Sequence, residues 1–486
     1  QEVVVVHSFS PSVLSVQVRT TTFQDNGLSL ALTASLEDIA ESVENALEPC
    51  RSDITKTCKV SVGRSELGGL GLIASSNIRK GETFLAMPYD DMVVLTPDLA
   101  RKLVFKDILP DGYDGWTGDA GLLALLLLNE VARAQDGKGI DQPKRPDKIQ
   151  TFMETWISAL PDPQSMDHPL LWSDADQEVL QSSSTNKIYR LLDDIEEDAN
   201  WLINKVWSKD PDTFPETVSW NGKNIPCFSA KGYIWAMALC NSRSFFVDGM
   251  LRLMPLFDSC NHRNKAPEVK GGFMGTFGTT KGAVLMADTN YKAGEEVFCS
   301  YGPKSAADYL LDHAFCPDQV WNTAVSELTF EVDPDDRFYD DKMDILEFET
   351  YDQAPMDPVQ SFDVISEVGR DGEPDPAMMQ FVRLCKLTGQ DAFLLESIFR
   401  KEVWGFVSMP VSEPNELLAA NAIIEACQKA LDDFAECPPG GPEICSKLRQ
   451  SESKALTRTL EYLQRDKEAL DLKEYYQERR LKDLGL

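Results

Sequence analysis

The chain has 486 residues, a formal net charge of −32 and an ordinary hydrophobic fraction of 43%. This length predicts two or three domains rather than one compact core. Such acidity excludes a protein that holds DNA or RNA through a basic surface, and it fits either simple solubility or the steering of a basic protein substrate.

The eleven cysteines are scattered without a C-x-x-C pair, which indicates a reducing compartment and predicts no metal site. The longest apolar run, residues 121–128, is far shorter than the roughly 20 residues of a membrane span. We therefore expect an intracellular protein of the cytoplasm or a plastid that contacts neither membrane nor nucleic acid.

Residues 1–54 predict an N-terminal extension that is partly disordered. Its first 34 residues, rich in Ser, Thr and Val, fit either the remnant of a targeting segment or a disordered tail. Residues 35–49 predict a short helix capped by Ser35, with Ile39, Val43 and Leu47 on one face. Residues 57–96 change to short apolar runs separated by Gly, Asn and Asp, which is typical of short strands with tight turns.

A helical period dominates residues 117 to 245, where Leu122, Leu126 and Val131 mark one amphipathic helix. Strands are predicted again over residues 245–303. Residues 331–380 are acidic and rich in proline, which predicts an exposed linker, and residues 380–486 are helical. The fold class is therefore α+β with a separate all-α C-terminal domain.

A glycine-rich turn between two predicted strands lies at residues 67–74. Gly69 and Gly71 would let a ligand approach the backbone, and the N–H groups of such a turn suit an anion. A hairpin turn without a ligand fits the same residues. No helix pattern follows, which excludes a dinucleotide-binding fingerprint.

Polar residues follow apolar runs at residues 241–244 and again at residues 258–262, which end in Asn261-His262. Such groups are costly to bury unless they are paired, so a binding site and a backbone-capping turn both fit. Farther on, a predicted strand ends in Tyr301-Gly302-Pro303. Taken alone, Tyr301 is more often a packed tyrosine at a strand end than a catalyst.

Together and in this order, the three segments resemble the SET methyltransferase family. The resemblance narrows to the subgroup of the Rubisco large-subunit lysine methyltransferase, with its related histidine and non-histone lysine enzymes. The segment TWISALP at residues 155–161, the helical insertion between the two strand regions, and the helices near residues 412–418 and 458–469 support this narrower match.

The resemblance implies a protein methyltransferase that uses S-adenosylmethionine and acts on a lysine, or else a histidine, of a non-histone protein. It implies a SET domain over residues 55–330 with a helical insertion at about 112–240. It also implies an acidic linker and a helical substrate-binding domain over 331–486, in a monomer without metal. A SET scaffold that keeps the cofactor pocket but has lost efficient catalysis is the alternative.

By resemblance, Tyr301 is the active-site tyrosine. Arg243 would lie near the amino-acid end of the cofactor, and Phe315 would pack on its adenine. The resemblance implies this full set of cofactor-binding residues: Gly69, Leu70, Gly71, Arg243, Asn261, His262 and Phe315.

His313 departs from the family pattern Leu-Leu-x-Tyr-Gly-Phe, which here reads Leu-Leu-Asp-His-Ala-Phe over residues 310–315. We expect His313 to line the pocket for the substrate amine and to titrate near neutral pH. A histidine that merely fills space at the pocket rim is the alternative. The interval 263–290 holds Phe273 and Phe277 but no tyrosine, although relatives often supply a second pocket tyrosine there.

Overall fold

The computed structural model describes residues 35–486 apart from 111–112, 114, 141–143, 181–183, 275–279, 318–324, 348–354, 366–371, 438–440, 477–478 and 480–486. The predictions for residues 1–34 and for Phe277 lie outside the described residues. Helix α1 (Leu36–Leu47) begins as predicted at Ser35, whose hydroxyl accepts a hydrogen bond from the Asp38 N–H. Ala40, Val43 and Leu47 of α1 are buried in the same core as the neighbouring strands, so α1 belongs to the same domain as these strands.

Two small antiparallel sheets form the strand core. One has the order β11 (Glu296–Val297), β3 (Leu70–Ala74), β2 (Val60–Arg64). The other has the order β1 (Thr57–Cys58), β4 (Thr83–Pro88), β10 (Thr280–Met286), β9 (Lys270–Met274). The hairpin of β2 and β3 carries the glycine-rich turn, as predicted.

A threaded segment brings distant parts of the chain together. The Cys299 N–H donates to the Asn261 carbonyl (3.0 Å), and the Arg263 N–H donates to the Cys299 carbonyl (2.9 Å). Residues 262 and 299 thereby form a parallel bridge, and so do residues 268 and 300. This arrangement places Asn261 and His262 beside Tyr301, although about 40 residues of sequence separate them.

The helical insertion contains α4 (Gly118–Asp136), α5 (Asp147–Ala159), α7 (Lys187–Lys205) and α8 (Ala230–Arg243). Its hairpins are β5 (Thr217–Trp220) with β6 (Lys223–Pro226), and β7 (Ser244–Val247) with β8 (Met250–Leu253). The prediction that α4 is amphipathic is wrong, because every residue from Gly121 to Ala132 is buried. Helices α5 and α8 pack on α4 together with β5, so it is a core helix.

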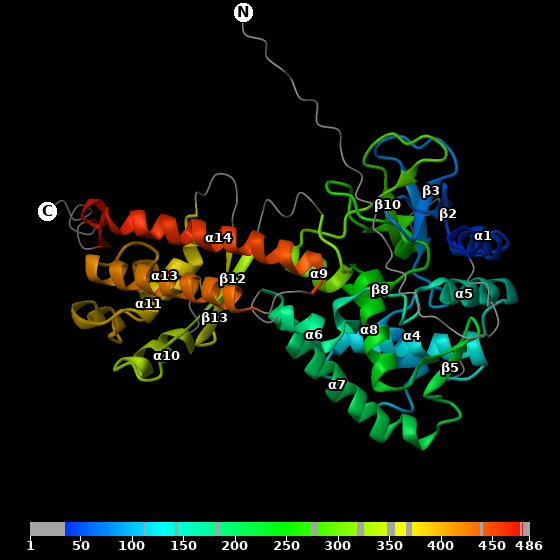
Figure 1. Cartoon of the computed structure of the whole chain (residues 1–486), viewed down its shortest axis with the longest axis horizontal. Helices are drawn as coiled ribbons and strands as arrows, with labels where there is room; N and C mark the ends of the chain where they lie inside the picture. The colour runs from blue at the N-terminus through cyan, green and yellow to red at the C-terminus, as the bar shows by residue number, and fades with distance from the viewer. Residues whose placement is uncertain are drawn as a thin grey trace, which may run out of the picture.

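The helices of the C-terminal domain include α10 (Tyr339–Glu347), α11 (Pro376–Cys385), α12 (Val403–Val407) and the two long helices α13 (Glu413–Glu436) and α14 (Glu443–Lys467), which pack along each other (Figure 1). The prediction of an exposed linker over residues 331–380 is wrong. β12 (Val325–Glu331) pairs antiparallel with β13 (Val359–Ile365), and α10 lies between them in the chain. Leu328 and Val364 face the domain core, and the acidic residues Glu327, Glu331 and Asp363 alternate with inward-facing residues on the exposed face. This alternation is the strand signal, and the prediction gave more weight to the acidic and proline-rich composition.

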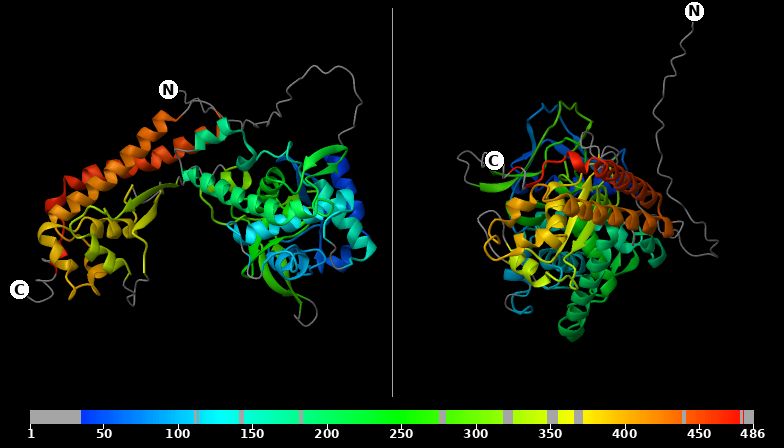
Figure 2. Two further views of the ribbon diagram at one scale, coloured as in Figure 1. Left: turned by 90° about the horizontal axis from the view of Figure 1, so that it is seen from below. Right: turned by 90° about the vertical axis from the view of Figure 1, so that its left-hand side faces the viewer.

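The C-terminal domain packs on the rest of the chain where α14 reaches the helical insertion (Figure 2). Cys445 and Leu448 of α14 belong to the same hydrophobic core as the strands and the helical insertion. Helix α9 (Ala306–His313) contacts both α14 and α8. Within the described residues, no helix combines the length and the apolar character needed to cross a membrane.

Candidate active site

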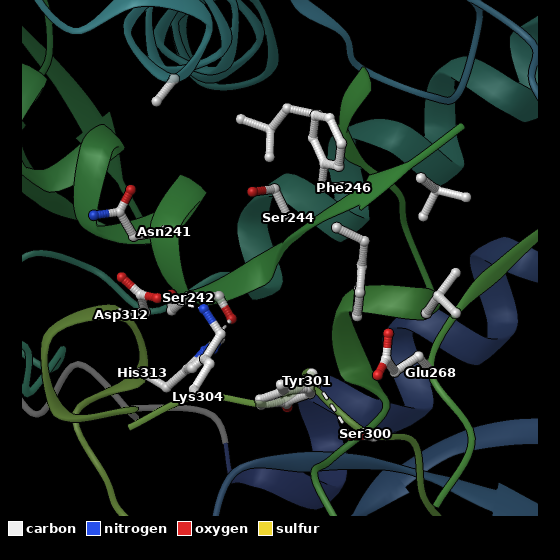
Figure 3. A pocket seen from close by; sticks show the side chains of 16 residues that line it. Asn241, Ser242, Ser244, Phe246, Glu268, Ser300, Tyr301, Lys304, Asp312 and His313 are labelled. Atoms are coloured by element: carbon white, nitrogen blue, oxygen red, sulfur yellow. Dashed lines mark hydrogen bonds and ion pairs between the residues drawn. The ribbon is translucent and has the colours of Figure 1, made fainter. Parts of the chain in front are cut away.

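Three cavities meet at Tyr301. The first, of about 420 Å³, is lined by Glu268, Tyr301 and His313 among others, and we call it the His313 cavity (Figure 3). The second, of about 320 Å³, is lined by Gly69, Arg243 and Tyr301, and the third, of about 740 Å³, by residues including Tyr301 and Phe315. Tyr301 thus stands between the His313 cavity and the cavities next to the glycine-rich turn.

One backbone carbonyl and one imidazole ring of the threaded segment hold Tyr301 in place. Its hydroxyl donates to the Cys260 carbonyl (3.1 Å), and its N–H donates to Nδ1 of His262 (3.2 Å). Burial raises the pKa of the Tyr301 phenol well above its ordinary value, so the hydroxyl stays protonated. Its ring centroid lies 4.5 Å from that of His313 and 6.2 Å from that of Phe315.

The two glycines of the predicted turn lie in different elements, because Gly69 belongs to the turn whereas Gly71 lies in strand β3, paired with Gly63. Gly69 has a φ of +69°, and a Cβ there would meet nothing within 4 Å, so this glycine serves the turn conformation on an open cavity wall. A Cβ on Gly71 would collide with the Glu296 carboxylate and crowd the Asn261 amide. Gly71 therefore makes room for these two side chains.

The Asn261 amide ties the glycine-rich turn to the threaded segment. Its Nδ2 donates to the Leu70 carbonyl (3.1 Å) and to Oε1 of Glu296 (2.8 Å). Oε2 of Glu296 accepts from the Ser65 hydroxyl (3.0 Å). Neighbouring His262 accepts at Nδ1, so its proton lies on Nε2, which is buried without a partner among the described residues. Burial lowers the pKa of His262 to about 4 and keeps it neutral.

Arg243 occupies the last turn of α8 and reaches a cavity with 28% of its side chain exposed. One guanidinium nitrogen donates to both the carbonyl and Oδ2 of Asp258, each at 3.3 Å. Nε1 of Trp156 donates to the same Oδ2 (3.0 Å), while Oδ1 of Asp258 is buried without a partner in the described part of the chain. Burial raises the pKa of Asp258, and the charge of Arg243 opposes that rise.

His313 ends α9 and lies on the cavity wall beside Tyr301. Because Ser242 offers a carbonyl, His313 Nδ1 donates to it (3.3 Å), and Nε2 keeps a lone pair with no partner among the described residues. The expectation that His313 titrates near neutral pH is wrong. Burial, aided by nearby Lys304, lowers its pKa to about 3.

Comparison with known proteins identifies this arrangement. Residues 69–302 match the family described as SET domain, and residues 333–437 match that described as Rubisco LSMT substrate-binding. The chain belongs to the SET-domain proteins of the Rubisco LSMT type.

Individual relatives agree with this assignment. A chloroplastic [fructose-bisphosphate aldolase]-lysine N-methyltransferase of Arabidopsis thaliana is 29% identical over 94% of this chain and 90% of its own length. A chloroplastic Rubisco large subunit N-methyltransferase of Nicotiana tabacum is 28% identical over 86% and 80%. The crystal structure of the SET domain of LSMT bound to lysine and AdoHcy superimposes with a TM-score of 0.73 at 26% identity, covering 92% of this chain and 96% of that one.

In this SET-domain protein, the sequence reasoning missed three site residues. Glu296 lies in β11, five residues before Tyr301, and Asp258 lies three residues before Asn261. His168 lines a cavity with His313, is fully buried and donates from Nε2 to the Asp312 carbonyl (3.2 Å). A usable signal existed, because the chain has only four histidines and three of them lie at this site.

The cavity walls fit S-adenosylmethionine, which carries a carboxylate, an ammonium and an adenine. Arg243 offers a cation, Asp258 an unpaired oxygen, and His262 an unpaired N–H donor. The ring of Phe315 lines both cavities next to the glycine-rich turn. Among the described residues, no group of three or more His, Cys, Asp or Glu side chains is placed to hold a metal ion.

Proposed function

We propose that this chain is a protein-lysine N-methyltransferase that uses S-adenosylmethionine and acts on a non-histone protein. One observation carries the proposal: Tyr301 lies where the His313 cavity meets the cavities beside the glycine-rich turn. Two ligands that enter from different sides can therefore meet at one phenol. The relatives named above methylate lysines of Rubisco or aldolase, according to their names.

When bound, the cofactor supplies a methyl group on a cationic sulfur, and the C–S bond breaks as the bond to the amine nitrogen forms. The protein contributes mainly position and electrostatics, because this displacement needs little acid–base chemistry. The Tyr301 side chain lines all three cavities, and its hydroxyl, held by the Cys260 carbonyl over 3.1 Å, offers a polar oxygen there. Such oxygens orient a polarised methyl group through weak C–H···O contacts.

A lysine must lose its proton before it attacks. The walls of the His313 cavity favour this, because burial disfavours the charged amine and because His313 stays neutral and adds no positive charge. The lone pair on Nε2 of His313 faces no partner within the described structure, so it is available to accept from an incoming N–H. We assign His313 to the substrate pocket on this ground.

On the cofactor side, we propose that Arg243 binds the carboxylate and that Phe315 packs on the adenine. Asn261 positions the Leu70 backbone through its hydrogen bond, and His262 offers its Nε2–H. We further propose that the domain over residues 331–486 holds the protein substrate. A plastid location and a monomeric state complete the proposal, and the chloroplastic relatives support the first of these.

Methyl transfer from labelled cofactor to purified Rubisco and to purified aldolase tests the function. We expect label on protein with the wild-type chain and its loss with Tyr301→Phe. Amino-acid analysis of the labelled protein should yield methyl-lysine. Methyl-histidine would instead show that the enzyme modifies histidine. If the chain binds the cofactor but labels neither protein nor any protein of a plastid extract, it would be a SET scaffold that has lost efficient catalysis.

A further inference from the structure

One carboxylate in the His313 cavity has no partner. Glu268 lines the cavity, and its side chain makes no hydrogen bond or ion pair in the part of the chain that the structure describes. The other charged side chains on the wall, Lys304 and Asp312, form an ion pair with each other. Since His313 is neutral, the cavity carries one uncompensated negative charge.

Backbone pairing holds Glu268 close to the proposed reaction centre. Residue 268 forms a parallel bridge with Ser300, the residue before Tyr301, and the Ser300 N–H donates to the Pro267 carbonyl (3.0 Å). Figure 3 shows Glu268 on one side of the cavity, with Asp312 and His313 on the other. The carboxylate therefore lies apart from the ion pair.

Apolar side chains also line the His313 cavity. Phe246 lines the cavity and is 73% exposed, which is unusual for a phenylalanine. Leu251 and Val269 line the cavity as well. A cavity with an apolar wall and one free carboxylate matches a side chain with an aliphatic stem and a cationic tip.

We propose that Glu268 is a substrate-recognition residue that binds the ammonium group of the target lysine as it enters the His313 cavity. This inference rests on the proposed function. A lysine arrives almost entirely as the ammonium at neutral pH, since its ordinary pKa is about 10.4. An unpaired carboxylate attracts it and raises its local concentration.

Capture and chemistry make opposite demands on this carboxylate. A negative charge favours the ammonium form, whereas methyl transfer needs the neutral amine. Glu268 therefore contributes to substrate capture, and the amine reacts at Tyr301 on the cavity floor. Removal of the charge should raise KM for a lysine substrate and leave kcat little changed.

The test compares two small probes on the full chain saturated with S-adenosylhomocysteine: N-acetyl-lysine methylamide and its norleucine counterpart, which lacks the amino group. Ligand-observed NMR measures both affinities at low and high salt. We expect the wild-type chain to prefer the lysine probe by about fivefold, the worth of one partly exposed ion pair. This preference should shrink with salt.

Glu268→Gln should abolish the preference and its salt dependence, and Glu268→Asp should retain part of it. Glu197→Gln is the matched control. Glu197 is exposed on α7, so this substitution removes the same charge outside the His313 cavity. Unchanged cofactor affinity in each variant shows that the fold is intact. If Glu268→Gln keeps the full preference for the lysine probe, the role of Glu268 is overturned and the proposed function stands. If the wild-type chain neither prefers the lysine probe nor transfers methyl groups, the proposed function is overturned as well.

Discussion

His313 donates a hydrogen bond from Nδ1 to the carbonyl of Ser242 over 3.3 Å, and this contact links the end of α9 to the last turn of α8. The bond assigns the imidazole tautomer and leaves Nε2 with a lone pair that has no partner among the described residues, in a side chain that lines the cavity shared with Tyr301. A tyrosine, which the family has at this position, would offer a hydroxyl instead. The substrate pocket that we propose therefore differs chemically from the family pattern at residue 313.

This relationship predicts a kinetic effect of His313 without an effect on cofactor binding. His313→Ala should lower kcat/KM by about tenfold, or about 1.4 kcal/mol, since it removes an acceptor for the amine. His313→Tyr should change the rate or the number of methyl groups added. Because the pKa of His313 is about 3, the wild-type pH profile between pH 6 and 9 should carry no imidazole titration. An inflection near pH 6.5 that disappears in His313→Ala would contradict this assignment.

Glu296 lines none of the cavities around Tyr301, yet its pairing with Asn261 predicts that its loss weakens cofactor binding. Glu296→Ala leaves the Asn261 amide and the Ser65 hydroxyl without their acceptor. Affinity for S-adenosylmethionine should fall by about 1–3 kcal/mol, measured by titration calorimetry. Asn261→Ala and Gly71→Val should weaken binding through the same pair, and exposed Glu295→Ala serves as the control. Wild-type affinity in all three variants would remove this support role.

The backbone conformation of Ala314 predicts that a glycine at this position stabilises the fold. Ala314 caps α9 in the left-handed region, with φ +60°, where the family pattern has glycine. An alanine there is strained by roughly 1–2 kcal/mol, of which glycine recovers part after its own entropic cost. Ala314→Gly should stabilise the chain by about 0.5–1 kcal/mol and raise the thermal midpoint. Ala307→Gly inside α9 should do the opposite, and a lower midpoint for Ala314→Gly would count against the strain.

Glu452 predicts an unusual pH dependence of stability. This α14 carboxyl is buried against the catalytic domain, accepts from the Ser184 N–H (3.3 Å) and leaves Oε2 without a partner among the described residues. Burial raises its pKa from 4.5 to about 7. Between pH 4.5 and 7 the folded state holds a proton that the unfolded state has released, so this group lowers the free energy of unfolding as pH rises.

Glu452→Gln should remove this dependence and stabilise the chain at pH 8 by about 2 kcal/mol, because the neutral amide still accepts from Ser184. Urea denaturation at pH 5, 6, 7 and 8 measures the effect, with exposed Glu425→Gln as the control. Equal pH dependence in the wild type and Glu452→Gln would show that the carboxyl is ionised without cost at the domain contact.

Several features of this protein followed from residues close together in the sequence. Ser35 and Asp38 determine where α1 begins, because a helix cap involves only its first turn. The glycine-rich turn and the Tyr301 strand end were likewise visible as local patterns. The order of the motifs along the chain was enough to indicate the family and its cofactor.

Only the tertiary structure decided how these motifs combine. Glu296 pairs with Asn261 across 35 residues, and Gly71 is required by both, so no local pattern could single out Glu296. The buried state of α4 and the pKa of His313 likewise depend on neighbours from other elements. The domain boundary also depends on distant contacts. Strand β12 pairs with β13, and Leu448 of α14 is buried in the core of the SET domain. Burial and pairing are properties of distant contacts, whereas helix caps and turns are properties of adjacent residues.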